Sequence, residues 1–126
     1  MRHQPRLAAV LALACLVGCA GYTPQQIVEQ GKQRTHESAQ PPRLVAGCIA
    51  RNLENSSDAL TASVREGPEP GNFEVVLRVP VMKFNPNNAT FRIAATPQGS
   101  EAIMFMRPEI SDETTDKVAG TAFAGC

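Results

Sequence analysis

The sequence predicts an α+β domain: a four-stranded antiparallel β-meander with two helices packed on one face, preceded by a polar tether. Three observations support this fold class. Apolar residues recur at helical spacing in one segment before and one segment after a central stretch. Within that stretch, apolar and polar residues alternate with a period of two, as expected for strands with one buried face. Clusters of Gly, Pro and Asn separate the alternating segments.

The first predicted helix covers residues 43–55, after the break at Gln40-Pro41-Pro42. Its apolar side chains repeat every three to four residues, so they share one stripe while charged residues occupy the opposite side. The stripe consists of Leu44, Val45, Cys48, Ile49 and Leu53, opposite Arg43, Arg51 and Glu54. We expect the apolar stripe to pack on the sheet.

Four strands are predicted next, at residues 60–65, 73–79, 90–95 and 101–107. The turn Gly67–Gly71 joins the first two strands as a hairpin, and Asn85–Asn88 marks the turn before the third. The fourth strand differs from the others because both of its faces are apolar in the middle. Either it is covered on both sides, or it presents a patch that binds a partner through Met104, Phe105 and Met106.

The second helix is predicted to begin after Ser111, a residue suited to the N-cap position, with Asp112 and Glu113 in the first turn. Its apolar residues again share one face, and the last of them is a cysteine. They are Val118, Ala119, Ala122, Phe123 and Cys126. The two predicted helices therefore each carry a cysteine, Cys48 and Cys126, on the side that faces the core.

The first eighteen residues do not fit this domain. Arg2 and Arg6 precede an unbroken apolar run over residues 7–17, which is too short to span a bilayer but suits an export signal. The run ends in Leu16-Val17-Gly18-Cys19, which resembles the lipobox of bacterial lipoproteins. The resemblance implies that the Cys19 thiol receives lipid, that cleavage removes residues 1–18, and that fatty chains anchor the remainder to a membrane. Ala20 in place of Asp favours the outer membrane over the inner membrane.

Residues 19–40 are polar and are predicted to be the tether, so the globular domain spans residues 41–126. Within the tether, Thr23-Pro24-Gln25-Gln26 has the arrangement of a capping box, which indicates a short helix or a frayed segment. Cys15 leaves with the signal and Cys19 carries lipid, so Cys48 and Cys126 are the thiols that remain. In an oxidising periplasm they are expected to form one disulfide.

Catalytic and cofactor sites are not predicted. His36 is the one histidine after residue 18 and lies in the predicted tether, and two bridged cysteines leave no set of ligands at metal-binding spacing. There is no glycine-rich phosphate loop. Loss of Arg2 and Arg6 leaves 10 basic and 12 acidic side chains, which is not the basic excess typical of nucleic-acid binding. We therefore expect no enzyme activity, no metal, no cofactor and no nucleic acid.

Two features are candidates for binding. Besides the apolar patch on the fourth strand, Arg65, Arg78 and Arg92 occupy the polar side of three successive strands. They form either a basic stripe for carboxylates and phosphates, such as those of peptidoglycan, or an ordinary solvated face paired with Glu74 and Glu101. The predicted function is non-enzymatic binding of an envelope protein or cell-wall component. The alternative is an inhibitor of lysozyme-type enzymes that acts through Gly67–Gly71 or Asn85–Asn88.

Overall fold

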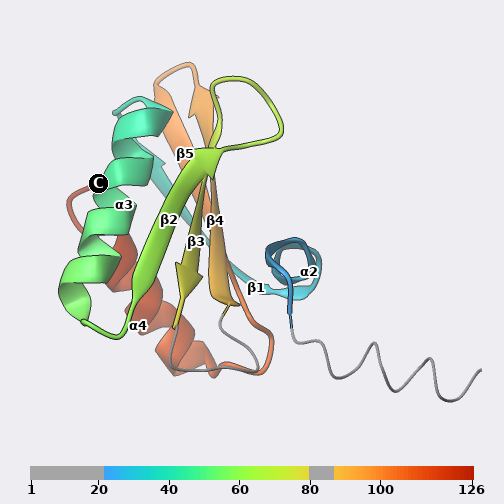
Figure 1. Ribbon diagram of the computed structural model, residues 1–126. Helices are drawn as coiled ribbons and strands as arrows, with labels where there is room; N and C mark the ends of the chain where they lie inside the picture. The colour runs from blue at the N-terminus through green and yellow to red at the C-terminus, as the bar shows by residue number, and fades with distance from the viewer. Residues whose placement is uncertain (1–21, 80–86) are drawn as a thin grey trace, which may run out of the picture.

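The computed structural model describes residues 22–79 and 87–126, which form a sheet with helices on both of its faces (Figure 1). Along the chain the elements are α2 (Pro24–Gln30), β1 (Lys32–Ser38), α3 (Pro42–Ser56), β2 (Thr61–Glu66), β3 (Phe73–Arg78), β4 (Asn87–Thr96), β5 (Gly99–Met106) and α4 (Asp112–Phe123). The α+β class with an antiparallel sheet is confirmed. Residues 1–18 and Cys19 lie outside the described residues.

The sheet has five strands in the order β1-β5-β4-β3-β2, and every neighbouring pair is antiparallel. The predicted number of four strands was therefore wrong. The four expected strands correspond to β2 to β5, while the additional strand, β1, lies in the segment predicted to be a tether. Its sequence, KQRTHES, contains no apolar residue, so the alternation that indicates a strand is missing.

Polar side chains hold β1 against the rest of the domain. Lys32 lies 3.0 Å from a carboxylate oxygen of Asp112, and Arg34 lies 2.6 Å from one of Asp116, which ties the strand to α4. The hydrogen bond and the positive charge of Lys32 lower the pKa of Asp112 below its ordinary value. The His36 ring stacks on Phe123 of α4, with ring centroids 4.9 Å apart. These contacts hold β1 in place, whereas the other strands are held by apolar packing.

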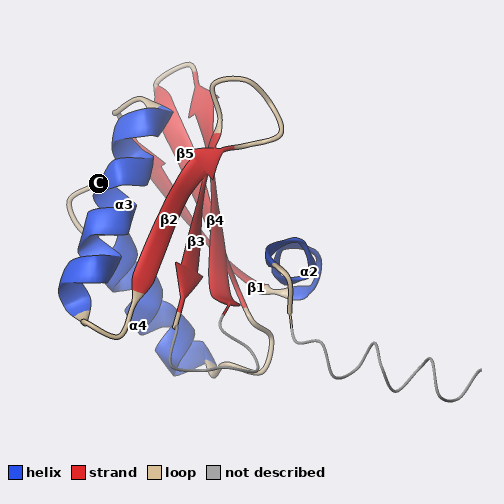
Figure 2. Cartoon of the chain, viewed as in Figure 1, coloured by secondary structure: helices blue, strands red, loops and turns tan. Residues whose placement is uncertain are grey.

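Helices α3 and α4 pack on one face of the sheet, as predicted, and enclose the main core with it (Figure 2). The core residues come from the stripes and strand faces that the sequence pattern indicated. They include Val45, Ile49, Leu53, Val75, Leu77, Phe91, Ile93, Ala102, Met104, Met106, Ala122 and Phe123. The two helices are joined by the disulfide between Cys48 and Cys126, so the predicted bridge is confirmed.

The short helix α2 covers part of the opposite face, where it packs on β4 and β5. The expected capping box is present: the Thr23 hydroxyl accepts a hydrogen bond from the Gln26 N–H, and the Gln26 side chain accepts one from the Thr23 N–H. The Ile27 side chain is completely buried. A Cβ at Gly31 would lie 2.6 Å from the Met106 carbonyl oxygen, so glycine allows the chain to turn closely from α2 into β1.

Candidate functional site

The face of the sheet that carries α2 holds a cluster of three charged residues, Arg65, Glu74 and Arg92. They come from β2, β3 and β4, and the strand registers place them in one row, with Glu74 opposite both arginines. Arg65 approaches one carboxylate oxygen of Glu74 through Nε at 2.9 Å and Nη2 at 2.7 Å. Arg92 donates from Nε to the other oxygen at 3.2 Å. One carboxylate therefore orients two guanidinium groups.

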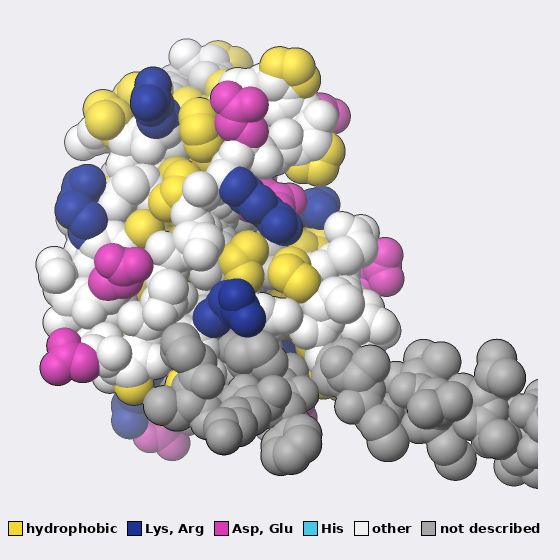
Figure 3. Space-filling model, viewed as in Figure 1, with side chains coloured by type: hydrophobic (Ala, Val, Ile, Leu, Met, Phe, Trp, Pro, Cys, Tyr) yellow, Lys and Arg dark blue, Asp and Glu magenta, His cyan; other side chains and the backbone are white. Residues whose placement is uncertain are grey.

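Burial differs sharply within this row. The Glu74 side chain is 7% exposed, whereas those of Arg65 and Arg92 are 54% and 37% exposed. Glu74 compensates one of the two positive charges, so the cluster presents a surplus of one positive charge to solvent. In Figure 3, dark blue side chains lie over this edge of the sheet with an acidic group between two of them. Such oriented, half-exposed guanidinium groups suit the recognition of carboxylate or phosphate groups.

Helix α2 contributes to one end of the row. The Gln25 side-chain oxygen accepts a hydrogen bond of 3.2 Å from Arg92 Nη2, so the guanidinium is fixed from two sides. Arg78 is exposed, but it follows Glu74 by four residues on the same strand, where it lies opposite Thr61 and Asn87. The structure thus brings Arg65 and Arg92 together around Glu74, and it leaves Arg78 outside this cluster.

The residues predicted as an apolar patch on β5 are buried. Met104 and Met106 are 0% and 2% exposed and belong to the main core. Phe105 points to the other face and is 7% exposed. Because β5 lies between β1 and β4, neither its edge nor its side chains are available to a partner. The structure therefore matches the first of the two interpretations, a strand that is covered on both sides.

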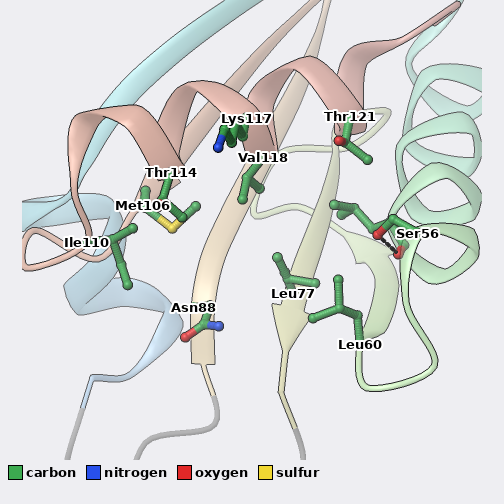
Figure 4. A pocket seen from close by; sticks show the side chains of 11 residues that line it. Ser56, Leu60, Leu77, Asn88, Met106, Ile110, Thr114, Lys117, Val118 and Thr121 are labelled. Atoms are coloured by element: carbon green, nitrogen blue, oxygen red, sulfur yellow. Dashed lines mark hydrogen bonds between the residues drawn. The ribbon is translucent and has the colours of Figure 1, made fainter.

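A cavity lies on the helical side of the sheet, between α3, α4 and the strand ends, with a volume of about 210 Å³ (Figure 4). Its walls are mainly apolar, and polar side chains stand among them. The apolar residues are Leu53, Leu60, Leu77, Met106, Ile110 and Val118, and the polar ones are Ser56, Asn88, Thr114, Lys117 and Thr121. Lys117 is exposed and pairs with Glu113 at 3.2 Å. The sequence alone does not predict this cavity, although each apolar member belongs to a predicted helix or strand or lies directly beside one.

His36 takes part in the packing between β1 and α4. Besides the stack on Phe123, its Nε2 atom is buried and has no hydrogen-bond partner among the described residues. Within residues 22–79 and 87–126, no three His, Cys, Asp or Glu side chains converge in a way that suits a metal ion. In the same ranges, no helix has the length and apolar character needed to cross a membrane.

The two loops considered for enzyme inhibition lie at opposite ends of the sheet. Gly67–Gly71 joins β2 to β3 at one end and is largely exposed. Asn87 and Asn88 begin β4 at the other end, where the Asn87 side chain donates to the Tyr22 carbonyl and that of Asn88 accepts from Arg107. Residues 85 and 86 lie outside the described residues.

Comparison with known proteins gives little further information. No protein-family model matches the chain, and no curated protein sequence matches it. Among solved structures, the crystal structure of protein CV1439 from Chromobacterium violaceum is similar with a TM-score of 0.38 and 11% sequence identity, over 75% of this chain and 93% of that chain. A likeness of this degree carries no argument about function.

Proposed function

We propose that the protein is a non-enzymatic lipoprotein of the bacterial envelope that binds a cell-wall component or another envelope protein. In this proposal the Cys19 thiol carries the lipid, the anchor lies in the outer membrane, and the domain faces the periplasm. The sequence Leu16-Val17-Gly18-Cys19 after a basic end and an apolar run supports the anchor. The disulfide between Cys48 and Cys126 is consistent with an oxidising compartment.

The cluster of Arg65, Glu74 and Arg92 is the observation that carries the binding role. A shared carboxylate holds two arginines side by side while leaving each of them about half exposed or somewhat less. Because their orientation is already fixed, an incoming carboxylate meets donors that lose little freedom on binding. We therefore propose carboxylate groups, such as those of the peptide stems of peptidoglycan, as the ligand chemistry.

Lipid attachment is tested by growing cells that express the full chain with radioactive palmitate. Label is expected in the wild-type protein and in Cys15→Ser, but not in Cys19→Ser, and only the labelled proteins should need detergent for release from membranes. The Cys15 variant is the matched control, because it removes a neighbouring thiol of the same segment. Label that persists in Cys19→Ser would contradict the proposed anchor.

Binding is tested by sedimenting the protein with isolated peptidoglycan. Arg65→Gln and Arg92→Gln are each expected to weaken binding about tenfold, since a charge-assisted hydrogen bond contributes roughly 1.5 kcal/mol. Binding should also weaken when the salt concentration rises from about 50 mM to about 500 mM. Arg51→Gln, which removes the same charge from an exposed position on α3, is the control and should change little. Equal effects of all three substitutions would exclude a specific role for the cluster.

A further inference from the structure

The cavity lies at the end of the domain where the chain enters from its N-terminal side. Met106 ends β5, Leu77 is next to last in β3, and Asn88 is second in β4, so these three lining residues mark one end of the sheet. Tyr22 is fastened to the same end. The Asn87 side chain donates to the Tyr22 carbonyl at 3.0 Å, and the Arg107 guanidinium lies over the Tyr22 ring at 5.8 Å. Figure 1 shows α2 and this end of the sheet close together.

The covalent chain limits how far this end can lie from an anchored cysteine. Tyr22 lies three positions after Cys19 in the sequence, and a fully extended chain spans at most about 3.6 Å per residue, so roughly 11 Å is the upper bound. The contacts from Tyr22 through Arg107 to Asn88 then connect it to the wall of the cavity. If Cys19 carries the lipid, as the proposed function holds, the end of the domain that contains the cavity lies within reach of the bilayer.

We infer that the cavity takes up the end of one acyl chain of a bilayer phospholipid. Six apolar side chains line it, so hydrocarbon is the chemistry that it favours, whereas water gains few hydrogen bonds there. The polar residues Thr114, Lys117 and Thr121 all come from α4, and Lys117 is exposed. Its ammonium group suits the phosphate of the same lipid, since its exposed pair with Glu113 holds it only weakly.

This inference rests on the proposed lipid anchor, and it adds a second contact with the membrane. The anchor alone sets a limit on distance and does not fix the orientation of the domain. A chain held in the cavity would fix which end of the domain faces the lipid. It would also point the loop Gly67–Gly71, at the other end of the sheet, away from the membrane.

The experiment uses the absence of tryptophan from the chain. A single tryptophan introduced at the cavity by Ile110→Trp, or at the far loop by Glu69→Trp, reports contact with brominated acyl chains, because bromine quenches indole fluorescence. Full-length lipidated protein is placed in vesicles of phosphatidylethanolamine and phosphatidylglycerol with brominated chains, and flotation of the vesicles measures anchoring separately. We expect Ile110→Trp to lose most of its fluorescence and Glu69→Trp to keep it.

Filling the cavity distinguishes entry of a chain from mere contact of the rim with lipid. Val118→Phe and Thr114→Phe, each combined with Ile110→Trp, are expected to restore fluorescence while the protein still floats. Thr114 is exposed on α4, so that substitution leaves the core unchanged, and circular dichroism verifies the fold of both variants. Quenching that both variants leave intact would overturn the inference. So would a floating protein in which Ile110→Trp is not quenched, whereas a protein that fails to float overturns the anchor and this inference together.

Discussion

Reduction of the disulfide between Cys48 and Cys126 tests the central packing arrangement of the domain. The bridge joins residues 78 positions apart in the sequence. In the chain-entropy treatment, a closed loop of that length stabilises the folded state by about 4.5 kcal/mol at 25 °C, because the cross-link restricts the unfolded chain. Since a domain of this size has a free energy of unfolding of only about 5–10 kcal/mol, reduction should remove a large share of it.

The folded contacts around the bridge should survive reduction, so the expected effect acts mainly on the unfolded state. The Asn52 side-chain amide donates to the carbonyls of Ala122 at 3.0 Å and Ala124 at 2.8 Å, so the end of α4 stays fixed to α3 without the covalent link. The reduced protein should therefore remain folded in the absence of denaturant. Its unfolded state should be more expanded, and the dependence of its free energy on urea should be steeper.

The assay is urea unfolding of residues 20–126, followed by circular dichroism with and without reductant. The double variant Cys48→Ala and Cys126→Ala is the control, because reductant should not change its stability. A loss of less than about 1 kcal/mol on reduction would refute the argument, since it would mean that the cross-link hardly restricts the unfolded chain. Recovery of two alkylatable thiols in protein isolated from cells without reductant would refute the bridge itself.

Three further predictions concern single residues. His36→Phe should raise the free energy of unfolding by about 1 kcal/mol in urea unfolding, because it removes a buried nitrogen without a partner and keeps the stack on Phe123. Asn52→Asp should lower the free energy of unfolding by about 2 kcal/mol, and more than Asn52→Ala does, because a carboxylate would face the two carbonyls at the end of α4. The third concerns Asp112, whose pKa in the folded state is depressed by the hydrogen bond and charge of Lys32, so its stabilising effect is complete above the unfolded value and is lost as the pH falls through the lower folded value. Thermal unfolding of Asp112→Asn should therefore differ from wild type by a constant amount between about pH 5 and pH 8, and the difference should shrink below about pH 4.

The sequence predicts elements well where apolar side chains alone make the contacts. The helix around Ile49, the strands around Val75 and Phe91, and the helix that begins after Ser111 all have the spacing that their elements require. Strand β1 could not be found in this way. The side chains that it turns toward α4 are Lys32, Arg34 and His36. The first two pair with acidic residues of α4, and the His36 ring stacks on Phe123. When charged residues are assumed to face solvent, such a strand is predicted to be a tether.

The candidate sites depend on register, which the sequence does not specify. Arg65, Arg78 and Arg92 were predicted on one polar face, with pairing to Glu74 and Glu101 as the alternative to a basic stripe, and the alignment of the strands places Glu74 between the first and the third. Arg78 follows Glu74 by four residues on the same strand and therefore lies outside that row. The cavity is still less accessible to sequence reasoning, because its walls form only when α4 crosses the ends of strands that lie far from it in the chain.

Because both faces of β5 are apolar, the sheet needs a covering layer on each side, and so a third layer. Met104 and Met106 on one face and Phe105 on the other cannot all be buried by helices on a single side of a sheet. The capping box at Thr23 indicates a further helix, α2. Ile27 is the one buried residue of that helix. The capped helix is therefore the element expected to cover the second apolar face of this strand. That pairing also explains why residues 24–38 form part of the domain, so that little chain separates Cys19 from the folded body.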